Sequence, residues 1–186
     1  MLEKEVKILI ESPPLGELKK LLEKDLKFLG EEKQEDTYFN FIYRNFKVTD
    51  ETVRIRKTNG KIEVTYKGPK SSSTIKAREE ITVVIENLDN MISLLQRIGF
   101  YVVTNIVKTR LNYLDGNFII SLDYVENLGE FIEIEATTRM EDLEIQNYTN
   151  NFIRKYNIKG KLTTKSYLEL ILDKHEKNTS YNSNSY

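Results

Sequence analysis

The sequence has no cysteine and only one histidine among its 186 residues. Without cysteine there are no disulfides, thiolate metal sites or thiol nucleophiles, and the composition fits a reducing compartment. The single histidine, His175, lies in a polar C-terminal segment. Histidine triads and histidine-ligated zinc sites therefore have almost no residues to use. The chemistry must come from carboxylates, lysine, arginine and tyrosine.

Long hydrophobic runs and a large net charge are also absent. No stretch approaches the ~18 apolar residues of a membrane span, and the first residues lack the basic and apolar segments of a signal peptide. Lys plus Arg total 28 and Asp plus Glu total 29, whereas a nonspecific nucleic-acid-binding protein is usually more basic. We expect a cytoplasmic protein that binds no membrane and no specific nucleic-acid sequence.

The length and the hydrophobic content of 39% predict one globular domain. We place this domain at residues 1–172. Residues 173–186 have too few apolar side chains to pack, so we expect a disordered polar tail there.

Alternation of polar and apolar residues predicts β-strands along most of the domain. Glu3, Glu5 and Lys7 share one face of the first strand, and Arg54 and Arg56 share one face of a later strand. The other strands that we expect are Thr37–Phe46, Val53–Lys57, Lys61–Lys67, Ile75–Glu86, Val102–Tyr113, Phe118–Val125 and Phe131–Thr137.

Apolar residues at helical spacing predict amphipathic helices that cover this sheet. The first helix follows Pro13-Pro14 and is expected to stop at Gly30, and the second runs from Leu88 to Ile98 before Gly99. Two more are expected at Met140–Tyr156 and Thr163–Leu172.

The charged strand faces suggest a function only when they are considered together. A single polar face is usually solvated, but the pattern recurs on seven strand segments. If the sheet closes, these faces point into a tunnel, where like charges are tolerated only when a ligand or metal ion neutralises them. Cations suit a polyphosphate and carboxylates suit Mg²⁺ or Mn²⁺.

The motif Glu3-Lys4-Glu5-Val6-Lys7 resembles the E-x-E-x-K signature of the CYTH superfamily, also called triphosphate tunnel metalloenzymes. Further motifs resemble that family in the same order up to about residue 172. They are Val53-Arg54-Ile55-Arg56, Thr65-Tyr66-Lys67, Arg78-Glu79-Glu80, Lys108-Thr109-Arg110, Leu122-Asp123, Phe131-Ile132-Glu133-Ile134-Glu135 and Lys165-Ser166-Tyr167. The runs Gln34–Phe39 and Leu128–Phe131 resemble the class IV adenylyl cyclase branch.

The resemblance implies an α+β fold: a closed eight-stranded antiparallel β-barrel with a charged lumen, covered by helices. It also implies that Mg²⁺ or Mn²⁺ is bound by carboxylates at Glu3, Glu5, Asp123, Glu133 and Glu135. The triphosphate would be bound by Lys7, Arg54, Arg56, Lys67, Arg78, Lys108 and Arg110, with Lys165 contributing from the last helix. The expected catalytic residues are Glu133, Glu135 and Lys7. Family analogy also allows a homodimer.

Three functions are consistent with these residues. The charges explain the binding of a triphosphate and metal ions, but none explains the selection of adenine. We therefore favour a triphosphatase, which hydrolyses inorganic triphosphate or a related organic triphosphate by in-line attack of water. The second alternative is a class IV adenylate cyclase, which forms cyclic AMP and pyrophosphate from ATP. A non-catalytic sensor of polyphosphate or RNA 5′ ends is third, because five carboxylates would repel a polyanion without metal.

Overall fold

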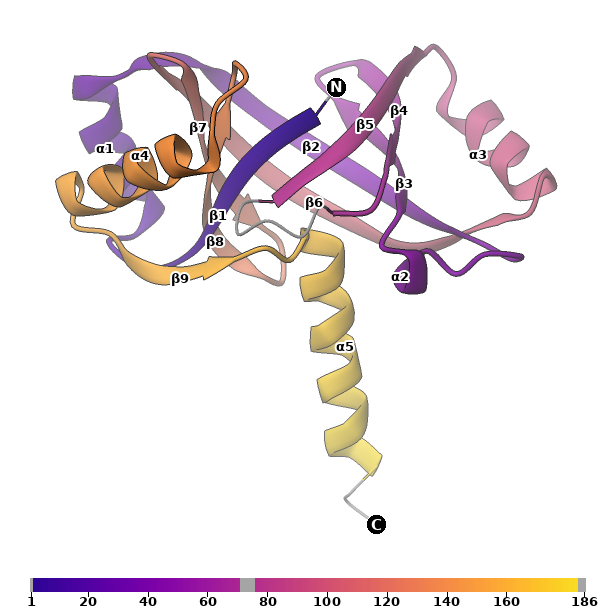
Figure 1. Cartoon of the computed structure of the whole chain (residues 1–186). Helices are drawn as coiled ribbons and strands as arrows, with labels where there is room; N and C mark the ends of the chain where they lie inside the picture. Colours follow the sequence, from indigo (N-terminus) through magenta and orange to yellow (C-terminus); the bar gives the residue numbers. More distant parts are fainter. Residues whose placement is uncertain (1, 71–75, 184–186) are drawn as a thin grey trace.

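The computed structural model describes the backbone of residues 2–70 and 76–183 and the side chains of residues 4–70 and 77–177. Most of this chain forms an antiparallel sheet that curls into a ring (Figure 1). The strands are β1 (Leu2–Ser12), β2 (Lys27–Phe41), β3 (Thr52–Thr58), β4 (Lys61–Lys67), β5 (Lys76–Ile85), β6 (Phe100–Asp115), β7 (Phe118–Val125), β8 (Gly129–Ala136) and β9 (Lys159–Thr163). The helices are α1 (Leu15–Asp25), α2 (Phe46–Thr49), α3 (Leu88–Arg97), α4 (Asp142–Lys155) and α5 (Tyr167–Ser183).

Eight strands complete the ring in the order β5-β4-β3-β2-β6-β7-β8-β1, and pairing between β1 and β5 closes it. Strand β9 pairs with β1 outside this ring order. The α+β class and the eight antiparallel strands that we expected are therefore present as a ring. Because neighbouring strands are in register, side chains that alternate along each strand form one continuous inner and one continuous outer face.

The outer face is apolar and is covered by helices. Leu18 and Leu22 of α1 and Phe152 of α4 belong to one buried cluster with Ile8 and Ile132 of the sheet. Helix α3 places Leu95 in a second cluster that includes strands β2 and β3. Burial of these apolar side chains stabilises the ring from outside. A further buried cluster joins Phe131 of β8 to Tyr167 and Ile171 of α5.

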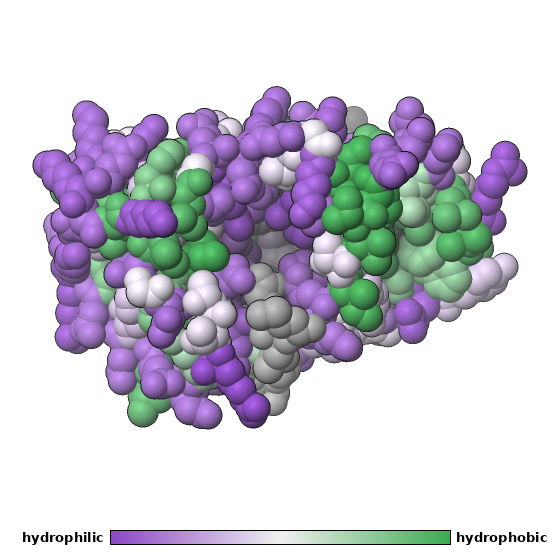
Figure 2. Space-filling model, turned by 90° about the horizontal axis from the view of Figure 1, so that it is seen from above, coloured by the Kyte–Doolittle hydropathy of each residue, from purple (hydrophilic) through white to green (hydrophobic). Residues whose placement is uncertain are grey.

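Part of the outer surface remains apolar and exposed. Figure 2 shows hydrophobic side chains on the side of the molecule formed by β5 and α3. The exposed large hydrophobic residues of these elements include Ile81, Val83, Val84 and Leu94. None of the helices in the described residues is long and apolar enough to cross a membrane.

Two expected boundaries were wrong near the first helix. The helix ends at Asp25, and Gly30 lies inside β2, where the register shifts between Phe28 and Gly30. Its φ of +147° suits glycine at this irregularity. Strand β2 starts well before Thr37, because β6 pairs with it from Lys27 onward.

The C-terminal region also differs from the expectation. Strand β9 occupies Lys159–Thr163, so the last helix begins at Tyr167 rather than at Thr163. That helix continues to Ser183, through most of the segment that we expected to be a disordered tail. Two contacts hold this part of the helix against the rest of the protein. Lys47 forms an ion pair with Glu176, and Nζ of Lys174 donates a hydrogen bond to the carbonyl oxygen of Asn127. Ile75, the expected first residue of β5, lies outside the described residues.

Candidate active site

The strand register brings the predicted site residues onto the inner face of the ring. Lys7 lies opposite Glu133 across the pairing of β1 and β8, and Glu5 lies opposite Glu135. Arg110 lies opposite Asp123 across the pairing of β6 and β7. Directly opposed residues of antiparallel strands point to the same side of the sheet, so charges far apart in sequence converge here.

A cavity of about 110 Å³ lies within the ring. Figure 2 shows a hollow near the middle of the molecule with hydrophilic residues around it. Most predicted phosphate-binding residues line the cavity, together with two of the predicted metal ligands. They are Lys7, Arg54, Arg56, Lys67, Arg78, Lys108 and Arg110, with Glu5 and Glu133.

Lys7 links two of the predicted metal-binding carboxylates. Its Nζ lies 3.0 Å from Oε1 of Glu133 and 3.9 Å from Oε1 of Glu5. It also donates to the carbonyl oxygen of Lys165 at 3.3 Å. The Lys7 side chain is only 2% exposed, so its charge depends on these oxygens rather than on water for stabilisation.

Asp123 is the centre of a second buried charge cluster. Nε of Arg110 donates to its Oδ1 at 2.7 Å and Nζ of Lys108 to its Oδ2 at 3.1 Å. Arg110 also contacts Glu133. Burial opposes the ionisation of Asp123, but the charges of Arg110 and Lys108 outweigh it and lower the pKa of Asp123. Burial and the neighbouring Arg110 lower the pKa of Lys108 to about 7.

Tyr167, at the start of α5, covers these lysines. Its ring centroid is 4.0 Å from Nζ of Lys7 and 4.9 Å from Nζ of Lys108, which are distances for cation–π attraction. Its hydroxyl donates to Oδ2 of Asp123 at 2.8 Å. Burial and the nearby carboxylates Glu133 and Asp123 raise the pKa of Tyr167 well above its ordinary value. The hydroxyl is therefore a neutral donor.

Asp36 holds two guanidinium groups on the opposite wall. Arg56 forms a bidentate pair with it, and Nη1 of Arg54 lies 3.7 Å from Oδ2. Nε of Arg54 is buried and has no hydrogen-bond partner among the residues whose side chains are described. A guanidinium fork with an unused donor on a cavity wall suits phosphate oxygens.

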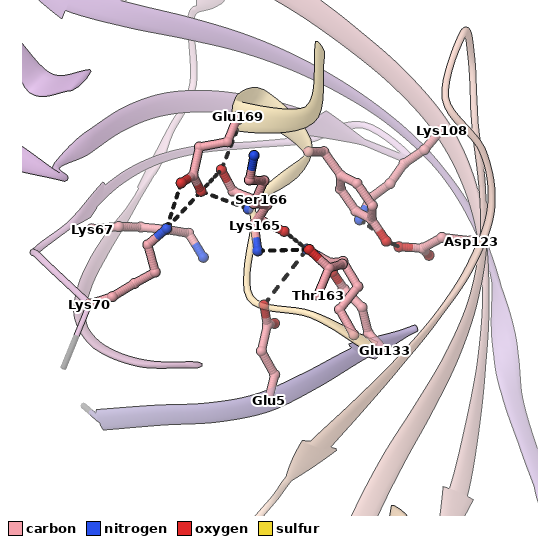
Figure 3. Close-up of polar contacts among 12 residues, drawn as sticks. Glu5, Lys67, Lys70, Lys108, Asp123, Glu133, Thr163, Lys165, Ser166 and Glu169 are labelled. Carbon is pink, nitrogen blue, oxygen red and sulfur yellow. Dashed lines mark hydrogen bonds and ion pairs between the residues drawn. The ribbon is translucent and has the colours of Figure 1, made fainter. Parts of the chain in front are cut away.

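A network of charges connects the cavity to α5. Arg78 donates to Oδ1 of Asp50 at 3.1 Å, and Lys70 lies 3.4 Å from the same oxygen. Lys70 also donates to both oxygens of Glu169, at 2.7 and 2.8 Å (Figure 3). Lys67 is paired with Glu80 on the neighbouring strand.

Besides Asp123, three predicted site residues place no described side chain in the cavity lining. Nζ of Lys165 lies 2.5 Å from Asp173 on the exposed surface, so it is the carbonyl of Lys165 that meets the cavity residues. Glu135 is partly buried opposite Glu5. Glu3 pairs with Arg78 through the backbone, but its side chain lies outside the described part of the chain.

Sequence reasoning missed several residues of this site. Asp36 lies within the run Gln34–Phe39, where alternation with Gln34 and Tyr38 places it on the polar face, but the sequence alone assigns it no role. Tyr167 belongs to the motif Lys165-Ser166-Tyr167, and the sequence assigns it no role either. Asp50 and Glu169 carried no signal, because their roles depend on contacts with Arg78 and Lys70 that only the fold creates.

The carboxylates have the donor chemistry for Mg²⁺ or Mn²⁺ but do not form a complete cage. In residues 4–70 and 77–177, no three acidic or histidine side chains converge in a way that could hold a metal ion. Lys7 lies between Glu5 and Glu133, and Arg110 bridges Glu133 and Asp123. Mg²⁺ is commonly bound by one or two carboxylates plus substrate phosphates. The set therefore fits a metal ion that binds together with a triphosphate.

The sequence profile of the CYTH domain matches residues 1–167. The chain belongs to the CYTH domain family. Enzymes of this family act on triphosphates, as triphosphatases or as cyclases, and its tunnel enzymes generally depend on divalent metal ions.

Three similar proteins illustrate the range of this CYTH family. A Methanocaldococcus jannaschii protein with the provisional name of adenylate cyclase is 39% identical over 175 residues, which are 91% of this chain and 98% of that protein. A Pyrococcus horikoshii structure is 37% identical with a TM-score of 0.80, over 92% of this chain and 99% of the other. A Hippeastrum protein provisionally named an adenylyl cyclase, and described as having a dominant triphosphatase activity, shares the fold. Its identity is 20% and its TM-score 0.72, over 89% of this chain and 93% of that one.

Proposed function

We propose that this CYTH protein is a divalent-metal-dependent triphosphatase that hydrolyses inorganic triphosphate or a related organic triphosphate. The observation that carries the proposal is the convergence of seven cationic side chains from five strands on one cavity. Such a density of positive charge suits several phosphate groups rather than one. Carboxylates between the cations, such as Glu133, supply oxygen ligands and a base.

The residues divide into two groups by chemistry. Arg54 and Arg56 offer planar guanidinium forks that bind and orient phosphate oxygens. Glu133 accepts hydrogen bonds from Lys7 and Arg110 and would orient the attacking water and take its proton. Glu5 and Asp123, with Glu133, would hold Mg²⁺ or Mn²⁺. When bound, such an ion neutralises the phosphate charge that builds up in the reaction.

Hydrolysis is favoured because most of the described residues that line the cavity are charged, with Tyr38, Thr52, Ser166 and Tyr167 as the neutral ones. The charged residues explain the recognition of phosphate, and none of them would select a base. The dominant triphosphatase activity of the Hippeastrum protein is consistent with this choice. The adenylate cyclase reaction is the second candidate, because it is the activity for which the M. jannaschii protein is named. We propose a cytoplasmic location, and the homodimer stays a prediction.

Hydrolysis in ¹⁸O-labelled water with Mg²⁺ or Mn²⁺ tests this function. In-line attack of water on a terminal phosphorus of inorganic triphosphate puts the label into orthophosphate and leaves pyrophosphate unlabelled. This labelling pattern, abolished by a chelator, would support the proposal. Label in pyrophosphate would contradict attack at the terminal phosphorus, and no release of orthophosphate would contradict the triphosphatase.

A further inference from the structure

A second cavity, of about 500 Å³, lies where β1 changes its partner. The pairing of β1 with β5 ends at Glu5, and its pairing with β9 begins at Lys7. The wall of the ring is therefore made by different strands on the two sides of Val6. We call this cavity, between α4, the middle of β1 and the end of β9, the seam pocket.

The described residues that line the seam pocket are mainly neutral, and five of the ten are polar side chains able to form hydrogen bonds. Leu162 and Val6 add apolar surface, and Leu162 is 61% exposed. The neutral polar residues come from α4, from the end of β9 and from the position after it, and they are Gln146, Thr149, Asn150, Thr163 and Thr164. A mixture of apolar surface and a few amides and hydroxyls is typical of sites for small organic groups, and the volume lies in the usual range of roughly 300–1,000 Å³.

The seam pocket adjoins the cavity of the ring. Glu5 and Lys7 line both. Nζ of Lys7 reaches the carbonyl of Lys165, whose amide donates to the hydroxyl of Thr163 at 3.1 Å. Figure 3 shows the Glu5 side chain pointing from β1 toward Thr163. A phosphate near Lys7 would therefore have its substituent close to the seam pocket.

A third cavity, of about 210 Å³ beside α5, also adjoins the ring, because Thr52, Arg78 and Ser166 line both. It fits an organic group less well. Among the described residues, its wall carries four carboxylates, at Asp50, Glu51, Glu169 and Asp173, whereas the described lining of the seam pocket carries one, Glu5. A group attached to a polyanion enters more easily where fewer negative charges repel the phosphates.

We propose that the seam pocket binds the organic part of an organic triphosphate, a neutral polar group such as a nucleoside. The amide side chains of Gln146 and Asn150 would form hydrogen bonds to the edge of a base or to a sugar, and Leu162 would contact the flat face of a ring. This inference rests on the proposed binding of the triphosphate inside the ring. It gives the protein a preference for organic over inorganic triphosphate.

Calorimetric titration of ATP, GTP, CTP, UTP and inorganic triphosphate tests this preference, with Ca²⁺ in place of Mg²⁺ to slow turnover. We expect at least one nucleotide to bind more tightly than inorganic triphosphate. In Asn150→Leu, the affinity for that nucleotide should fall about fivefold, as for one lost hydrogen bond, while the affinity for inorganic triphosphate stays within about twofold. Asn151→Leu, at the next and also exposed position of α4, should change neither affinity.

The outcomes separate this inference from the proposed function. Inorganic triphosphate that binds as tightly as every nucleotide, or an equal loss for both ligands in Asn150→Leu, would overturn the seam pocket and leave the triphosphate site standing. An unchanged nucleotide affinity in both Asn150→Leu and Gln146→Leu would also overturn it. If neither inorganic triphosphate nor a nucleotide binds to the wild-type protein, the proposed function itself fails.

Discussion

Arg56 donates two hydrogen bonds to the Asp36 carboxylate, from Nε to Oδ1 at 2.6 Å and from Nη2 to Oδ2 at 2.7 Å. The two residues lie opposite each other on β2 and β3, and Asp36 is 2% exposed. Burial alone would raise the pKa of Asp36, but the charges of Arg54 and Arg56 lower it below its ordinary value. This carboxylate therefore positions two of the guanidinium groups that we propose bind phosphate.

Asp36→Asn should destabilise the protein at pH 7 by on the order of 3 kcal/mol, because it leaves buried guanidinium charge without a partner. A depressed pKa in the folded state gives stability above the unfolded pKa of about 3.9, and this stability is lost as the pH falls below it. The difference between wild type and variant should therefore narrow below about pH 4. Urea unfolding at several pH values measures this difference in the free energy of unfolding between wild type and Asp36→Asn. A difference that stays constant with pH would contradict the ion pair, and Glu35→Gln, an exposed neighbour, is the control.

Arg56→Ala should weaken the binding of inorganic triphosphate by about 10- to 100-fold, the effect of losing a charged hydrogen-bond donor of roughly 1.5–3 kcal/mol. Arg56→Lys keeps the charge but not the fork, so it should recover only part of the affinity. Arg154→Ala, on the exposed surface of α4, should bind as the wild type does. Calorimetry measures all three, and wild-type affinity in Arg56→Ala would refute the role of Arg56.

Glu133→Gln should lower kcat by about 100-fold or more, because the amide no longer accepts a proton from water. The affinity for triphosphate should change much less, since the substituted side chain keeps a similar size and a hydrogen-bonding oxygen. Steady-state kinetics together with calorimetry separate the two effects. Equal losses of turnover and affinity would argue against catalysis by Glu133. The control is Glu79→Gln, whose side chain is exposed on the outer face of β5.

The inner face of the ring could be predicted from the sequence because a strand has a strict period of two. Arg54 with Arg56 and Glu133 with Glu135 each fall on one face whatever the register. What the sequence could not supply was the partner across the sheet. Asp36 meets Arg56 only because β2 pairs with β3 in one register, and Asp50 reaches Arg78 from a turn 28 residues away in the chain.

The errors at the edges of elements have local causes. Glycine commonly ends a helix, but Gly30 instead accommodates an irregularity in the pairing of a long strand. The segment Lys159–Thr163 is short and mostly exposed, so it has no clear alternation, and its pairing with β1 makes it a strand. In both cases, pairing with a strand that is distant in the sequence determines the secondary structure.

Deletion of residues 173–186 tests the domain boundary that we proposed. The ion pairs Lys47–Glu176 and Lys165–Asp173 lie on the surface, and exposed pairs contribute little to stability. We therefore expect Tm to fall by less than about 3 °C and the unfolding transition to remain cooperative. Thermal unfolding followed by circular dichroism measures this. A fall of about 10 °C or more would show that the end of α5 is part of the folded domain.

The most direct measurement is a product analysis of the wild-type protein with Mg²⁺ or Mn²⁺, using inorganic triphosphate and ATP in separate reactions. Orthophosphate, pyrophosphate, ADP and cyclic AMP are resolved in each. We predict orthophosphate and pyrophosphate from inorganic triphosphate, and no cyclic AMP from ATP. Cyclic AMP with pyrophosphate from ATP would contradict the triphosphatase and establish the cyclase instead.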